Sequence, residues 1–111
     1  YMKADLQIPI GTHNGSENAL IFASFKPGGG MAPSRSDNCE QIYYVTSGEG
    51  LAGSENYQSP VNKGSFVFIP KGTTHWLKNK NRSTELKIFN VLTGAGSLVE
   101  ANYITLGTAN K

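Results

Sequence analysis

The chain has 111 residues and a formal net charge of +2, with 38% hydrophobic and 16% charged residues. This length supports one hydrophobic core, so we expect a single domain over residues 1–111. The small charge gives no reason to expect a nucleic-acid or membrane partner, and no apolar run approaches the roughly 20 residues that span a bilayer. The single Cys excludes an internal disulfide. Without a secretory pattern, a cytoplasmic location is the default expectation.

Short apolar and β-branched runs, separated by Gly, Pro, Asn and Ser, follow one another along the chain. No amphipathic period of 3.6 residues persists long enough to indicate a helix. In chain order, the runs predicted as strands are 5–10, 19–26, 41–47, 51–57, 66–69, 73–77, 85–93 and, less regularly, 99–106. The intervening segments 11–18, 27–40 and 48–50 are expected to form loops and turns. About eight to ten short strands predict an all-β sandwich or barrel.

A spaced pattern of turn residues around one histidine is the most specific signal. Gly64, Pro70, Gly72, His75 and Asn79 follow G-x5-P-x-G-x2-H-x3-N. This pattern resembles the second conserved motif of the cupin superfamily, in which the His is one of four metal ligands inside a small barrel. The resemblance implies a cupin-type jelly-roll β-barrel.

The first cupin motif, G-x5-H-x-H-x3,4-E-x6-G, can be laid on residues 28–48. Ser34 and Ser36 then stand where the family has its two His, and Gln41 stands where it has Glu. Hydroxyls and a carboxamide are weak ligands for divalent transition metals. We therefore expect a degenerate metal site and no metal cofactor.

Other side chains could replace the missing ligands. Glu40 is a better ligand than Gln41, but strand side chains alternate, so it should face away from Gln41 unless a bulge intervenes. Cys39 shares the parity of Gln41 and could bind a soft metal or act as a nucleophile, although a buried Cys is more often a small core residue. His13 would need the N-terminal loop to fold over the barrel mouth.

These residues leave three functions open. The first is binding of a small organic ligand in the former metal pocket. The second is a metal-independent isomerase, cyclase or lyase, with His75 as general acid or base and Gln41 as a hydrogen-bond donor. The third is a metalloenzyme that uses His75, Glu40 and Cys39. A homodimer is the family expectation. The candidate ligand-binding residues are Ser34, Ser36, Gln41, Tyr43, His75 and Asn79.

Overall fold

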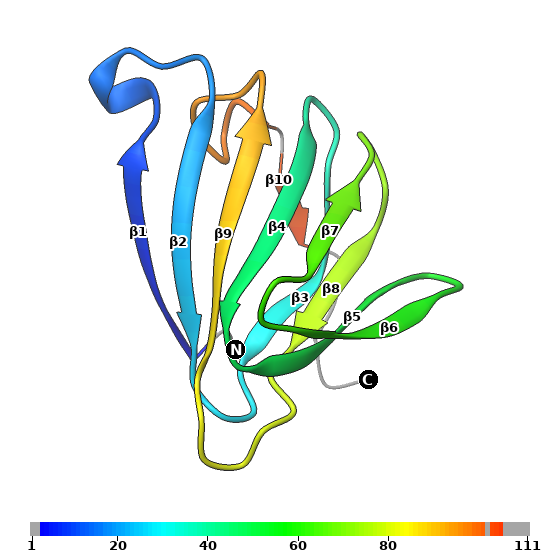
Figure 1. The fold of residues 1–111 in the computed structure, drawn as a ribbon. Coiled ribbons are helices and arrows are strands. Elements are labelled where there is room, and N and C mark those ends of the chain that lie inside the picture. Colours follow the sequence, from blue (N-terminus) through cyan, green and yellow to red (C-terminus); the bar gives the residue numbers. More distant parts are fainter. Residues whose placement is uncertain (1–2, 102, 106–111) are drawn as a thin grey trace.

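The computed structural model describes residues 3–101 and 103–105, which form strands and one 3₁₀ turn (Figure 1). No helix in these ranges is long and apolar enough to cross a membrane. The elements are β1 (Ala4–Ile10), η1 (Thr12–Asn14), β2 (Ala19–Phe25), β3 (Gly30–Ser36), β4 (Glu40–Ser47), β5 (Glu49–Ser54), β6 (Gln58–Asn62), β7 (Phe66–Ile69), β8 (His75–Lys78), β9 (Leu86–Thr93) and β10 (Tyr103–Thr105).

The strands form two five-stranded antiparallel sheets. Sheet A has the order β1-β2-β9-β4-β7, and sheet B has the order β10-β3-β8-β5-β6. Chain neighbours such as β3 and β4 lie in different sheets, as the jelly-roll form requires. The β5–β6 hairpin projects from the body of the molecule near β7 (Figure 1). The expected all-β jelly-roll barrel is confirmed.

Buried side chains alternate with more exposed ones along the strands, and this alternation explains how the strands enclose a core. In β2, Ala19, Ile21, Ala23 and Phe25 are buried, and the residues between them are half-buried. The other strands of sheet A that face the interior follow the same period of two, which directs every second side chain inward. One sheet face therefore supplies the core and the opposite face looks outward.

Several predicted boundaries were wrong. The segment expected as a loop contains β3, whose sequence GMAPSRS lacks strand-forming residues and is held by pairing with β8 and β10. Pro33, which has no backbone N–H, lies within the register shift between Met31 and Ser34. The run 51–57 is divided between β5, which already begins at Glu49 within the predicted turn 48–50, and the turn before β6, a strand that was not predicted. Strand pairing overrode the local propensity in both places.

The turn between β4 and β5 depends on a glycine. Gly48 has a φ of 89°, and a Cβ at this position would lie 2.3 Å from the carbonyl oxygen of Glu85. Only glycine adopts this left-handed conformation and also permits such a close approach. The turn transfers the chain from sheet A to sheet B.

Candidate functional site

The positions that correspond to the first motif converge on His75 inside the barrel. Ser34 of β3 is paired with His75 of β8, and the side-chain amide of Gln41 on β4 donates a hydrogen bond to Ser36 Oγ at 2.5 Å. All four side chains are at most 3% exposed. The strands thus gather, in the interior, residues that lie 41 positions apart along the chain.

Alternation on β4 decides which neighbouring groups join this cluster. Cys39, Gln41, Tyr43 and Val45 are all at most 2% exposed, whereas Glu40 is exposed on the outer side. Without a bulge at this point, the carboxylate of Glu40 faces away from His75. The predicted parity is confirmed.

Cys39 lies between Ser36 of this cluster and an apolar part of the interior. It packs in an apolar cluster with Ala19, Ile21 and Leu92, near the chain segment that follows β9. Burial raises the pKa of the Cys39 thiol, and a hydrogen bond with Ser36 and the charge of Lys71 only partly oppose this effect. The thiol therefore stays protonated near neutral pH, which suits a core residue better than a nucleophile.

The residues around His75 do not fit a divalent transition metal. Within the described ranges, no group of three or more His, Cys, Asp or Glu side chains lies close enough to hold one. The Ser34 hydroxyl already donates to the carbonyl oxygen of Ala32 at 2.6 Å, and His13 is exposed on η1. Two hydroxyls, a carboxamide and one imidazole form a weak donor set for such an ion.

His75 is held as a neutral imidazole with a defined tautomer. Its Nδ1 atom lies 3.1 Å from the backbone oxygen of Thr73, which can only accept, so Nδ1 carries the hydrogen. Burial lowers the pKa of His75, and the contact with Thr73 only partly opposes this shift. Nε2 therefore presents a lone pair, which can accept a hydrogen bond or a proton.

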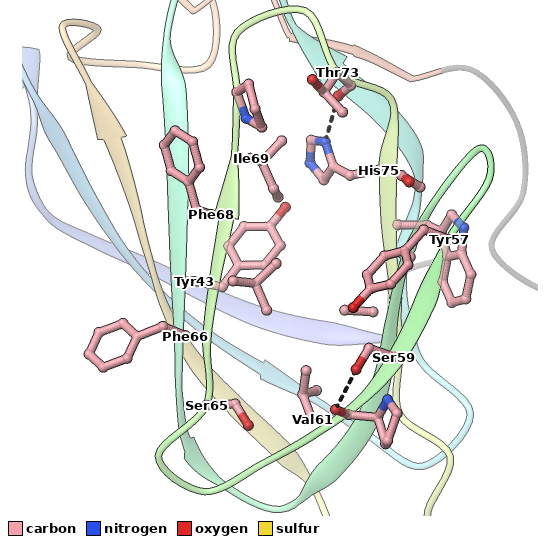
Figure 2. A pocket seen from close by; sticks show the side chains of 17 residues that line it. Tyr43, Tyr57, Ser59, Val61, Ser65, Phe66, Phe68, Ile69, Thr73 and His75 are labelled. Carbon is pink, nitrogen blue, oxygen red and sulfur yellow. Dashed lines mark hydrogen bonds between the residues drawn. The ribbon is translucent and has the colours of Figure 1, made fainter.

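A pocket of about 520 Å³ reaches the barrel interior between β7 and the β5–β6 hairpin. His75 and Tyr43 stand at its inner part, with their rings 5.8 Å apart and Tyr43 close to Ile69 (Figure 2). β7 borders one side of the pocket, where Phe66 and Phe68 are exposed and point outward, and Tyr57 lies on the opposite side (Figure 2). The pocket thus has a polar inner end at His75 and Tyr43.

Only some of the predicted site residues border this pocket. Tyr43 and His75 line it, whereas Ser34, Ser36 and Gln41 lie behind them. The Gln41 carboxamide connects the two groups, since its Oε1 accepts a bond from Tyr43 at 3.4 Å. These three residues support the pocket wall without reaching the space.

Asn79 has a structural role in the loop before β9. Its side-chain amide donates to the backbone oxygens of Phe25 at 3.0 Å and Thr84 at 2.9 Å, and its Oδ1 accepts from the backbone and side chain of Asn81. These bonds account for the amide group, and Asn79 does not border the pocket.

One buried polar residue was missed from the sequence. Asn90 on β9 is 5% exposed and is paired with Tyr43, and its Oδ1 has no hydrogen-bond partner among the described residues. The alternation of Leu86, Ile88, Asn90 and Leu92 places Asn90 on the inner face, so the sequence did contain the signal. Phe66 and Phe68 were not predicted to lie near the pocket, and their side chains point outward from β7.

Comparison with known proteins supports the fold from two directions. The family model described as Cupin domain matches residues 21–93. A cupin-like protein from Thermotoga maritima has a TM-score of 0.82 and 20% identity, with 100% of this chain and 81% of that chain covered. No curated protein sequence matches the chain.

Two other similar structures are described as enzymes. Peruvianin-I, described as a cysteine peptidase from Thevetia peruviana latex, has a TM-score of 0.79 and 16% identity over 96% of this chain and 68% of that chain. An oxalate oxidase has a TM-score of 0.75 and 20% identity over 94% of this chain, which spans only 55% of that enzyme. These likenesses establish the fold alone. Because the family model covers well over half of the sequence, the chain belongs to the cupin family.

Proposed function

We propose that this protein binds a small organic molecule in the pocket between β7 and the β5–β6 hairpin. The observation that carries the proposal is a pocket of about 520 Å³ that leads from the surface to His75 and Tyr43. Pockets of this size, mostly apolar and with a few polar groups, are typical of small-molecule sites.

The polar groups at the inner end give the bound molecule an orientation. His75 offers the lone pair of Nε2, because Nδ1 donates to Thr73. Tyr43 is positioned by Gln41, which is itself bonded to Ser36. A ligand that donates a hydrogen bond toward His75 would therefore meet a rigid acceptor in a dry environment.

The binding test needs no knowledge of the natural ligand. A library of small organic fragments is titrated into the ¹⁵N-labelled protein, and amide shifts are mapped onto the fold. We expect hits to move Ala52, Val61 and Ile69, which line the pocket. Ala52→Leu should fill the space and weaken these hits by about tenfold or more, whereas Val99→Leu, at an exposed turn, is the matched control. If the Ala52→Leu variant binds the same fragments with unchanged affinity, the pocket is not their binding site.

A metal-independent isomerase, cyclase or lyase is the second candidate, because the neutral His75 could accept a proton from a bound substrate. His75→Ala separates the two functions. In the binding function, affinity should fall by only about 2- to 10-fold, the value of one hydrogen bond. In the catalytic function, turnover of a substrate should fall by about 100-fold or more. Unchanged turnover would exclude His75 as the proton-transfer group.

A further inference from the structure

The strand of sheet A that borders the pocket has a partner on one side only. β7 is the last strand in the order β1-β2-β9-β4-β7, and among the described strands it pairs with β4 alone. In an antiparallel pair, alternate residues exchange backbone hydrogen bonds with the partner, and the residues between them direct their N–H and C=O groups away from it. The register therefore decides which backbone groups of β7 reach the free edge.

A hydrogen bond at the start of β7 identifies the residues that are bonded to β4. The backbone N–H of Val45 on β4 donates to the backbone oxygen of Ser65 at 3.0 Å. The next residue of β7 that bonds to β4 is then Val67, two positions further along. Phe66 and Phe68 lie in the alternate positions, so each presents one backbone N–H and one C=O at the free edge.

Two other sheet edges are protected against pairing with a further strand, and the edge of β7 is not. Edge strands are commonly blunted by Pro, which lacks an N–H, or by charged side chains. β1 contains Asp5 and Pro9, and β6 contains Pro60. β7 has the sequence FVFI, with no Pro and no charged residue. The edge of β7 can therefore accept another strand.

The pocket lies on the inner side of this edge. Val67 and Ile69 face inward from β7 and line the pocket with Tyr43, and the β5–β6 hairpin with Tyr57 borders its other side (Figure 2). None of the described side chains that line the pocket is charged. A strand added to β7 would lie about 4.8 Å from it, and its side chains would alternate between the two faces of the sheet. Every second side chain would then point toward the uncharged pocket.

The outer side of β7 would gain contacts from the same added strand. The side chains of Phe66 and Phe68 are 73% and 58% exposed. Aromatic side chains pair favourably with β-branched residues that lie directly opposite them on a neighbouring strand. An added strand rich in β-branched residues would therefore cover exposed aromatic surface while its backbone bonds to the edge.

Charged residues near β7 indicate the sign of charge that a bound segment would carry. Lys63 precedes β7 and Lys71 follows it, and both are exposed. The sequence contains no Asp or Glu in residues 57–84. The carboxylate of Asp37, which lies near the turn after β7, is paired with Arg35. Acidic residues at the ends of a bound segment would therefore be attracted to the ends of β7.

We propose that the edge of β7 and the adjoining pocket form a binding site for an extended segment of a partner protein. The segment has uncharged, apolar side chains at alternate positions and acidic residues at its ends. Phe66 and Phe68 supply the backbone pairing, the pocket receives the inward side chains, and Lys63 and Lys71 favour the acidic ends. This site goes beyond the binding of a small molecule and shares only the pocket with it.

Hydrogen exchange of single amides tests the pairing, with the ¹⁵N-labelled full chain and the synthetic peptide acetyl-EVTVTVE-amide. In the free protein, the amides of Phe66 and Phe68 should exchange faster than the amide of Val67, which bonds to β4. The peptide should slow exchange at Phe66 and Phe68 by at least about tenfold. If about 1 mM peptide slows neither amide, the proposal is wrong.

Altered peptides separate backbone pairing from charge. The peptide acetyl-KVTVTVK-amide reverses both terminal charges and should bind at least about tenfold more weakly. Two N-methylated forms of the acidic peptide, one methylated at its valines and one at its threonines, keep the side chains but lose alternate N–H groups. Only one of these sets can face β7, so one form should lose at least about tenfold in affinity. Unchanged affinity of both methylated forms would overturn the backbone pairing, and equal binding of the lysine peptide would overturn the acidic class.

Variants of β7 and its flanks provide the matching test on the protein. Phe68→Pro removes an N–H at the free edge without removing a bond to β4, whereas Phe68→Val removes the ring but keeps the N–H. The peptide should bind Phe68→Pro at least about tenfold more weakly than Phe68→Val, and equal affinities would overturn the edge site. Lys71→Glu should weaken the acidic peptide by several fold, whereas Lys26→Glu, at an exposed site three strands away in sheet A, should not. Equal affinities of these two lysine variants would overturn the acidic class.

A second copy of the chain as the occupant would give a different result. The amides of Phe66 and Phe68 would then be protected without peptide, and the protection would rise with protein concentration, which would overturn a foreign segment. The fragment titration at Ala52 and Ile69 tests the pocket separately. Fragments that bind while the peptide does not would leave the small-molecule function standing and overturn the edge site. Edge protection by the peptide in the absence of any fragment hit would support the edge site alone.

Discussion

The two faces of sheet A each depart in one respect from the usual pattern of apolar side chains inside and polar side chains outside. The inner face is mostly apolar but also buries the polar groups of Gln41, Tyr43 and Asn90, whereas the outer face carries the aromatic side chains of Tyr44 and Phe89. Burying polar groups is unfavourable unless they are bonded, and exposing aromatic rows is unfavourable unless they are covered. The comparison teaches that stability alone does not explain either face: the inner face contains buried polar groups, and the outer face exposes aromatic rings to solvent.

The largest expected effect is a difference in stability between variants of two adjacent tyrosines, which lie on opposite faces of sheet A. Tyr43 is 1% exposed and sits in the main core cluster, while Tyr44 is half-buried on the outer side. Tyr43→Ala should lower the free energy of unfolding by about 3–5 kcal/mol through cavity formation. Tyr44→Ala should lower it by about 1 kcal/mol through lost cross-strand contacts. Urea unfolding measures the free energy of both variants, and equal losses would contradict the difference between the two faces.

Restoring metal ligands tests the inner face directly. The triple variant Ser34→His, Ser36→His and Gln41→Glu should bind Co²⁺ at least about 100-fold more tightly than the wild type, because imidazole and carboxylate ligands then surround His75. Arg35→His, which replaces a partly exposed side chain between the two serines, is the control and should gain no such affinity. Cobalt absorption provides the measurement. A folded triple variant that gains no metal affinity would show that these positions do not converge as described.

Replacing the buried amide side chains of Gln41 and Asn90 should change the stability of the protein in opposite directions. Gln41→Leu removes the partner of Ser36 and Tyr43 and should lower the free energy of unfolding by about 1–3 kcal/mol. Asn90→Val removes an oxygen that has no partner among the described residues, so it should be neutral or should raise stability by about 1 kcal/mol. Thermal and urea unfolding distinguish the two. A large loss in Asn90→Val would indicate that its oxygen is satisfied in solution.

The smallest effect concerns pH. The pKa of His75 in the folded protein lies below its ordinary value of 6.5 because of burial. As the pH falls through that value, the unfolded chain binds a proton that the folded protein does not. Stability therefore falls with decreasing pH, by at most about 1.4 kcal/mol per pH unit from this group, until the folded pKa is reached.

The measurement is urea unfolding between pH 7.5 and 5. His75→Gln should reduce the slope with pH below 6.5, and His13→Gln, at an exposed site, is the matched histidine control. A slope that His75→Gln leaves unchanged would mean that the imidazole is accessible to protons in the folded protein.

Much of the barrel was predictable because its signals are local. The alternation in 19–26, 41–47 and 85–93 gave the period of strands β2, β4 and β9, and the parity of Cys39 and Gln41 held. β3 was missed because its backbone is held by neighbours far along the chain and not by its own residues. The resemblance around His75 placed the site, but it could not tell which residues border open space.

The sequence by itself determined the all-β class, the turn glycines and the inward direction of His75 and Gln41, since each depends on backbone preferences and on a period of two. Only the tertiary structure decided that the pocket ends at His75 and Tyr43 while the serines lie behind them. It alone aligned Phe22, Phe89, Tyr44 and Phe66 of four strands into one row on the outer face of sheet A. Both features depend on register between segments that are remote in the chain, and register is a property of packing that no single segment contains.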